Sequence, residues 1–185
     1  MTDWFTTTDG IWEKLWQVLA EGVADPAHPA RLPGFATTSP DGWPEVRTVV
    51  LRSADQKQQC VSVHTDLYST KIASLRATPR AALHIWDAST DLQIRLQAEV
   101  TILSGPETRP LWDRIPDHAQ QSYGVTPPPG TPIKSALDYR KEPDPTSFAV
   151  LDCRLVTVDA VHLGAQHRRA QFTRLRAWQG VWLSP

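Results

Sequence analysis

The segment 92–103, LQIRLQAEVTIL, restricts the fold of this chain more than any other feature. Its apolar residues occupy every second position: Leu92, Ile94, Leu96, Ala98, Val100 and Ile102. Its polar residues occupy the positions between them: Gln93, Arg95, Gln97, Glu99 and Thr101. Successive side chains of a β-strand point to opposite faces, so this alternation predicts a long strand with one apolar and one polar face.

Similar apolar runs predict further strands on both sides of this segment. They lie at 34–53, which holds two runs around the turn SPDG, and at 58–65, 80–86, 147–163 and 169–185. Short helices are predicted at 69–78, 105–115 and 117–124. At least six strands at hairpin spacing, without the regular strand–helix alternation of a doubly wound sheet, favour an antiparallel β-barrel decorated by short helices.

The N-terminal segment 1–33 is predicted to be a helix and a linker. Apolar residues follow a helical spacing at Trp12, Leu15, Trp16 and Leu19, and Thr8 or Asp9 precedes them as a cap. The segment 125–145 is a proline-rich loop of a length that is usually functional, an arm or disordered. Because 185 residues suit one domain, we expect a single domain over 1–185.

Composition excludes several classes of protein. The net charge of −1 gives no basic field for nucleic acid. No apolar run approaches a membrane span, and the first ten residues lack the features of a signal peptide. The two cysteines, Cys60 and Cys153, lie in strand-like runs, and the six histidines show no metal-binding spacing. We therefore expect a cytoplasmic protein without a metal, a membrane or a nucleic-acid partner.

Three hydroxyls and one amine gather where a predicted strand turns into a helix. They belong to Thr65, Ser69, Thr70 and Lys71. The start of a helix offers unpaired N–H groups and the positive end of its dipole, so this cluster suits a phosphate. The alternative is an ordinary helix cap beside a surface lysine, and the cluster alone does not decide between them.

Two arginines stand at the ends of the apolar run RTVVLR. Strict alternation places Arg47 and Arg52 on opposite faces of a flat strand, so they cannot both reach one small group. They would serve a long ligand, or a bulge would rotate one of them. The alternative is two arginines that extend to water from an edge strand.

Two other polar groups are candidate binding residues. Gln93 lies on the polar face of the longest predicted strand, and its amide both donates and accepts hydrogen bonds. His167, Arg168 and Arg169 lie together near the C-terminus, where they form either an anion site or a salt-bridged surface turn.

The order of these motifs resembles that of the pyridoxamine 5′-phosphate oxidase-like flavoproteins. The matching motifs are RTVVLR at 47–52, HTDLYSTK at 64–71, TPRAALHIW at 78–86, LQIRL at 92–96, QHRR at 166–169 and the final W…WLSP. The chain looks closer to the shorter oxidase-related, FMN-binding branch than to the authentic oxidase.

The resemblance implies a split β-barrel and a homodimer with two FMN sites at its interface. It assigns FMN binding to Arg47, Thr48, Val49, Val50, His64, Thr65, Ser69, Thr70, Lys71, Gln93 and Arg169. Arg47 and the strand backbone after it would meet the phosphate and ring, the turn around Lys71 would grip the phosphate, and Gln93 would come from the partner subunit. Thr70 stands where the authentic oxidases have arginine, which removes one bidentate phosphate partner.

The residues on the substrate side depart further from the oxidase. The resemblance places Arg52, His167 and Arg168 there. Ala170 replaces the histidine of the family's Arg-x-His motif, and LWDRIPDHAQ lacks the expected tyrosine, arginine and serine in register. FMN binding is therefore implied more strongly than oxidation of pyridoxamine 5′-phosphate.

The resulting functional hypothesis is an FMN-dependent oxidoreductase that passes a hydride from a small-molecule substrate to flavin N5. The first alternative is a non-catalytic split barrel that binds flavin or haem. A second alternative is a structural dimer whose tryptophan-rich surface binds another protein.

Overall fold

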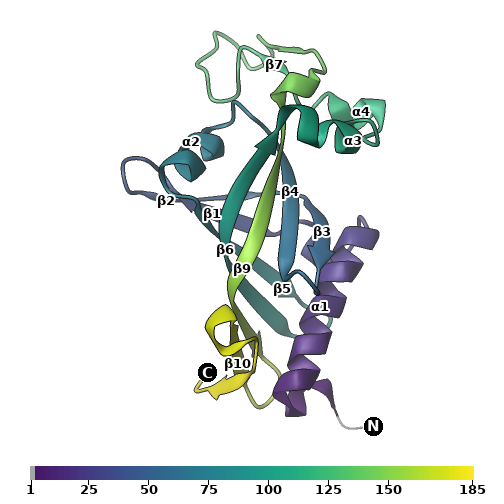
Figure 1. Cartoon of the computed structure of the whole chain (residues 1–185), viewed down its shortest axis with the longest axis vertical. Helices are drawn as coiled ribbons and strands as arrows, with labels where there is room; N and C mark the ends of the chain where they lie inside the picture. Colours follow the sequence, from purple (N-terminus) through teal and green to yellow (C-terminus); the bar gives the residue numbers. More distant parts are fainter. Residues whose placement is uncertain (1–2) are drawn as a thin grey trace.

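The computed structural model describes residues 3–185 and consists of antiparallel strands with helices at their periphery (Figure 1). The strands are β1 (Gly34–Thr38), β2 (Pro44–Thr48), β3 (Leu51–Asp55), β4 (Cys60–Asp66), β5 (Arg80–Asp87), β6 (Leu92–Ser104), β7 (Val125–Thr126), β8 (Arg140–Lys141), β9 (Phe148–His162), β10 (Arg168–Thr173) and β11 (Val181–Leu183). The α-helices are α1 (Thr8–Ala24), α2 (Thr70–Ala77), α3 (Arg109–Trp112) and α4 (Asp117–Gln120). Short 3-10 turns are η1 (Trp4–Thr6), η2 (Pro29–Arg31), η3 (Gly105–Thr108), η4 (Pro145–Ser147) and η5 (Arg174–Arg176). The predicted antiparallel β fold with an N-terminal helix is confirmed.

Strand β9 organises the sheet because it pairs with β4, β6 and β10. One edge of β9 follows β6, with a register shift between Gln97 and Ala98. The other edge pairs first with β4, between Phe148 and Arg154, and then with β10, between Thr157 and His162. The sheet therefore divides along β9, and β6 and β9 run side by side along the molecule (Figure 1).

The inner face of the sheet forms the main core. Phe35, Leu83, Leu96 and Val158 lie opposite one another across β1, β5, β6 and β9. All four are almost completely buried. This row confirms that the apolar face of the alternating segment points into the core.

Helix α1 closes one side of this core. Its cap lies one residue before the first predicted position, because Thr7 rather than Thr8 or Asp9 accepts a hydrogen bond from Gly10 N (3.0 Å). Leu15, Trp16 and Leu19 are buried on its inner face. Within residues 3–185, no helix is both long and apolar enough to cross a membrane.

The opposite face of the same strands is open to solvent. We call it the outer face, and it comprises Ala36, Val46, Ala82, His84, Trp86, Gln93, Arg95 and Gln97. Two large apolar side chains on it are exposed, Val46 by 73% and Trp86 by 41%. Exposed apolar side chains that gather on one face are typical of an interaction surface.

The proline-rich segment 125–145 is an arm that contains the two-stranded ribbon β7–β8. Gly124 N, at the start of the arm, donates to Asp66 Oδ2 at the end of β4 (2.9 Å), and Glu142 N donates to Gly124 O (3.1 Å). A small second core of Trp112, Tyr123, Phe148 and Val150 lies beneath α3. Figure 1 shows this arm at the end of the molecule that also carries α2, α3 and α4.

Candidate functional site

A cluster of polar groups lies where β4 ends and α2 begins. Lys71 Nζ donates to Thr65 Oγ1 (2.9 Å) and to Ser69 Oγ (3.1 Å). Ser69 is the N-cap of α2, but its side chain makes no capping hydrogen bond. The hydroxyl is therefore turned toward Lys71, and the interpretation as an ordinary helix cap does not fit this geometry.

Arg47 reaches the same cluster from β2. Its Nη1 donates to Thr37 Oγ1 (2.7 Å) and its Nη2 to Glu45 Oε2 (2.9 Å). Burial lowers the pKa of the Lys71 ammonium, and the nearby Arg47 guanidinium lowers it further. Two cations that repel each other in a partly buried place favour an anion between them. We call Arg47, Thr65, Ser69 and Lys71 the cradle.

Thr70 is oriented differently from the other residues of its turn. Its methyl group lies against the arm, since a Cβ built on Gly130 would stand 3.1 Å from Thr70 Cγ2. Its carbonyl accepts a long hydrogen bond from Ser74 Oγ (3.4 Å). The hydrogen bonds of the cradle thus join Thr65 and Ser69 to Lys71, while Thr70 faces the arm.

The link between β2 and β3 follows Arg47. Thr48 ends β2, and Val49 and Val50 lie between the two strands. Val49 N donates to Pro33 O (3.1 Å), so this amide is already bonded within the chain. The N–H of Val49 is therefore not free for the backbone contact to a flavin that the resemblance implies.

Arg52 belongs to a second cluster. The register between β3 and β4 shifts between Leu51 and Ser53, which places an irregularity at Arg52. The bulge that the sequence left open is therefore present, but Arg52 adjoins His64 and Tyr123 and not the cradle. Arg52 Nε and His64 Nδ1 are both buried without a hydrogen-bond partner. Unpaired buried polar atoms are rare in native proteins and indicate a bound water or ligand.

Burial shifts the pKa values of His64 and Tyr123 in the second cluster. Burial and the Arg52 charge lower the pKa of His64 from 6.5 to about 4, so its imidazole is neutral at pH 7. Burial raises the pKa of Tyr123, and the Arg52 guanidinium offsets part of that rise. No pattern in the sequence points to Tyr123, which is a single tyrosine between a polar turn and a glycine.

The lowered pKa of His64 predicts a loss of stability in acid. Between pH 6.5 and about 4 the unfolded chain binds a proton at His64 that the folded chain does not. The free energy of unfolding should therefore fall as pH drops through this window, and His64→Gln should reduce that fall. Urea unfolding at pH 7 and pH 5 measures it, with the exposed His118→Gln as the control. An unchanged pH dependence in His64→Gln would show that His64 titrates normally.

Gln93 lies on the outer face. Its Oε1 is 3.4 Å from His84 Nε2 on β5. Arg47 is opposite Phe35 on the inner side, and the strand register places Gln93 on the other side of the sheet. Gln93 and Arg47 therefore cannot meet on one ligand within a single chain.

Arg169 is held by a buried carboxylate that the sequence did not reveal. Arg169 Nη2 donates to Asp159 Oδ2 (2.8 Å), and Arg95 Nη2 lies 2.9 Å from the same oxygen. Burial alone would raise the pKa of Asp159, but hydrogen bonds from both arginines hold it below its ordinary value. The pair fixes Arg169 beside Arg95, on the side of the sheet that carries Gln93.

His167 and Arg168 lie far from the cradle. Arg168 begins β10, which Figure 1 shows at the end of the molecule opposite α2. Its guanidinium stands over the Phe5 ring (4.7 Å), and that ring stacks on His162 (4.4 Å, 7°). Arg168 Nη1 also donates to Gln166 O (2.9 Å). The structure thus does not bring these two residues together with Arg52 in one chain.

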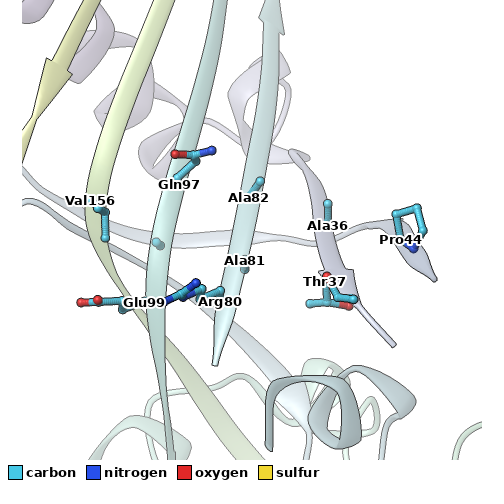
Figure 2. Close-up of a pocket in the computed structure, with 11 residues that line it drawn as sticks. Ala36, Thr37, Pro44, Arg80, Ala81, Ala82, Gln97, Glu99 and Val156 are labelled. Carbon is cyan, nitrogen blue, oxygen red and sulfur yellow. The ribbon is translucent and has the colours of Figure 1, made fainter. Parts of the chain in front are cut away.

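A shallow recess of about 460 Å³ opens across β1, β5 and β6. Figure 2 shows Ala36, Ala82 and Gln97 on three neighbouring strands at this recess, with Arg80 and Glu99 at one end. Small side chains of the outer face, such as Ala36 and Ala82, form its floor. One of its lining residues, Thr37, also accepts a hydrogen bond from Arg47 of the cradle.

Comparison with known proteins identifies related sequences. Residues 11–104 match the family model described as the pyridoxamine 5′-phosphate oxidase, FMN-binding domain. A pyridoxine/pyridoxamine 5′-phosphate oxidase of Thermosynechococcus vestitus is 29% identical over 160 residues, which cover 79% of this chain and 65% of the relative. The corresponding protein of Rhizobium meliloti is 26% identical over 151 residues, which cover 82% and 64%. The match thus spans less than two thirds of the length of these relatives.

Solved structures share the architecture. A pyridoxamine 5′-phosphate oxidase-related, FMN binding protein from Nostoc punctiforme PCC 73102 has a TM-score of 0.76 at 24% identity, covering 94% of this chain and 96% of its own. PhzG from Burkholderia lata 383, solved with tetrahydrophenazine-1-carboxylic acid, has a TM-score of 0.75 at 18% identity, covering 100% and 97%. Similarity at such low identity shows the fold alone, and it confirms the predicted split β-barrel.

Proposed function

We infer that this chain, which belongs to the family of the pyridoxamine 5′-phosphate oxidase FMN-binding domain, is a flavoprotein that binds FMN. The observation that carries this proposal is the cradle. Burial lowers the pKa of Lys71, and Arg47 is close enough for its charge to lower that pKa further. Hydroxyls of Thr65 and Ser69 complete a donor set that suits a terminal phosphate without any glycine-rich loop.

The ring of the flavin would lie along the link of Val49 and Val50, between the cradle and the second cluster. Val49 is buried, and its side chain would give the ring an apolar support. Asp66 is near both clusters, because its carboxylate raises the pKa of both Lys71 and Tyr123. The phosphate of the flavin would then lie at the cradle and its reacting part at the second cluster, with the link of Val49 and Val50 between them.

The bound flavin would supply a hydride acceptor at N5, and the protein would supply orientation. Arg52 offers a guanidinium with N–H donors, and neutral His64 offers a donor or an acceptor beside it. Their unpaired buried atoms are the groups that a polar or anionic substituent of a small substrate would satisfy. We therefore propose that Arg52, His64 and Tyr123 bind the substrate.

We also propose that two copies of the chain complete each site. Gln93 and Arg169 lie on or beside the outer face, whereas the cradle faces away from it. Only a second copy, docked through its outer face, would bring Gln93 to a flavin held by the first. Exposed Trp86 and Val46 would be covered by such a contact.

A second candidate function is a flavoprotein without substrate turnover. Phe5 occupies the space beneath Arg168, which the resemblance placed on the substrate side. Its ring is fixed there by stacking on His162. A substrate that needed this guanidinium would have to displace an aromatic residue of the chain itself.

Anaerobic addition of electron donors to the FMN-loaded protein tests the proposal. A physiological substrate should bleach the longer-wavelength flavin band, and oxygen or another acceptor should restore it. Pyridoxamine 5′-phosphate should bleach it slowly or not at all, because the expected substrate-phosphate residues are absent from LWDRIPDHAQ. Rapid turnover of that compound would contradict this expectation, and a flavin that no donor reduces would favour the second candidate.

A further inference from the structure

The carboxylate of Glu45 forms an ion pair with Arg47, the arginine of the cradle. It precedes Arg47 by two residues in β2, so the two side chains share one face of the strand. Its Oε2 accepts from Arg47 Nη2 (2.9 Å) and from Ser74 Oγ (3.2 Å). Ser74 is buried in α2, one helical turn after Lys71. The carboxylate is therefore held between β2 and α2, at the side of the cradle.

The remaining donors of Arg47 leave little freedom for an incoming anion. Its Nη1 is shared among Thr37 Oγ1 (2.7 Å), Phe35 O (3.3 Å) and Glu45 O (3.3 Å). Glu45 Oε2 is the acceptor that the structure gives to Nη2, so an anion that bonds this nitrogen takes the place of Glu45. A phosphate that met Arg47 through two parallel hydrogen bonds would have to take over this position.

The environment of Glu45 permits such an exchange. Its side chain is 37% exposed, so the carboxylate has a path to water. The side chain of Arg47 is less exposed, at 22%, and is fixed by the three acceptors of Nη1. Arg47 therefore stays in place when Glu45 leaves, and any phosphate that remains beside the carboxylate is repelled by it.

We propose that Glu45 is a specificity-determining residue that occupies Arg47 in place of a phosphate oxygen and competes with the phosphate of the ligand. This inference rests on the proposed binding of FMN. Glu45 lowers the preference of the site for FMN over riboflavin, which has the same ring system and no phosphate. The cradle has two cations, and Glu45 neutralises part of the charge that they offer to a phosphate dianion.

The test compares FMN and riboflavin binding to flavin-free wild type and to Glu45→Gln. The glutamine keeps the size and an acceptor oxygen for Ser74 and Arg47, and it removes the charge. FMN should bind about threefold more tightly or better, the scale of a partly exposed charge pair. Riboflavin affinity should change by less than about twofold, because no phosphate meets the altered charge.

Two further variants make the result specific. Asp113→Asn is the matched control, because it removes a carboxylate from an exposed arginine pair of the same length (2.9 Å) at the end of α3. It should leave both affinities unchanged. Glu45→Asp keeps the charge and should keep the low preference for FMN, whereas a variant that merely loosens the fold would weaken both flavins.

The contrary outcomes are distinguishable. If FMN binds but Glu45→Gln leaves the ratio of the two affinities unchanged or weakens FMN alone, Glu45 is a structural clip for Arg47 and the inference is wrong. Equal tightening of FMN and riboflavin would also overturn it. If neither flavin binds to wild type or variant, the proposed function fails together with the role of Glu45.

Discussion

The Lys71→Ala variant should bind FMN roughly 1.5–3 kcal/mol more weakly than the wild type, which is about ten- to 150-fold in Kd. Lys71 Nζ already has hydroxyls of Thr65 and Ser69 as neighbours, and a phosphate would be its only full negative charge in the cradle. Removal of Lys71 also relieves the repulsion of Arg47, which favours the lower end of the range.

Titration of the flavin-free protein by fluorescence quenching measures this change. Lys57→Ala is the matched control, because Lys57 is an exposed lysine in the turn between β3 and β4. Riboflavin should bind Lys71→Ala and the wild type almost equally. An unchanged FMN affinity in Lys71→Ala would show that the phosphate lies elsewhere.

The Trp86→Asp variant should be monomeric and should lose FMN more than tenfold more readily than the wild type. Trp86 lies on the outer face directly opposite Gln93 in the β5–β6 register. A charge in the centre of an interface disfavours association, because charged residues are depleted there. If Gln93 acts on the flavin of the partner, loss of the dimer removes that contact from both sites.

Light scattering during size-exclusion chromatography, with flavin absorbance recorded on the same peak, measures both effects together. Leu111→Asp is the control, because Leu111 is exposed to a similar extent (39% against 41%) but lies in α3. It should remain dimeric and yellow. A Trp86→Asp monomer with full FMN affinity would contradict the shared site.

Regular parts of the fold could be read from the sequence because their signals are local. Strand β6 ends within one residue of its predicted limit, since strict alternation extends over its whole length. The apolar run at 147–163 predicted strand structure, and the structure has one long strand there, β9. Its division between β4 and β10 depends on partners far away in the chain, which no local pattern encodes.

The candidate site, like the fold, could be predicted from the sequence only where its residues lie close together in the chain. Lys71, Thr65 and Ser69 lie within seven residues, so spacing was sufficient to predict that they gather, but not to decide between a phosphate site and a helix cap. The contact of Asp159 with Arg95 and that of Glu45 with Ser74 join residues far apart in the chain. The sequence also could not decide where Arg52 points, because a bulge is set by the pairing of two strands.

The absorption spectrum of freshly purified protein tests the central claim most directly. The account predicts a yellow protein with the two flavin bands, and about one FMN per chain released on denaturation. Protein purified without flavin should regain both bands when FMN is added. A Soret band would indicate haem in place of flavin, and a colourless protein that takes up no FMN would contradict the account.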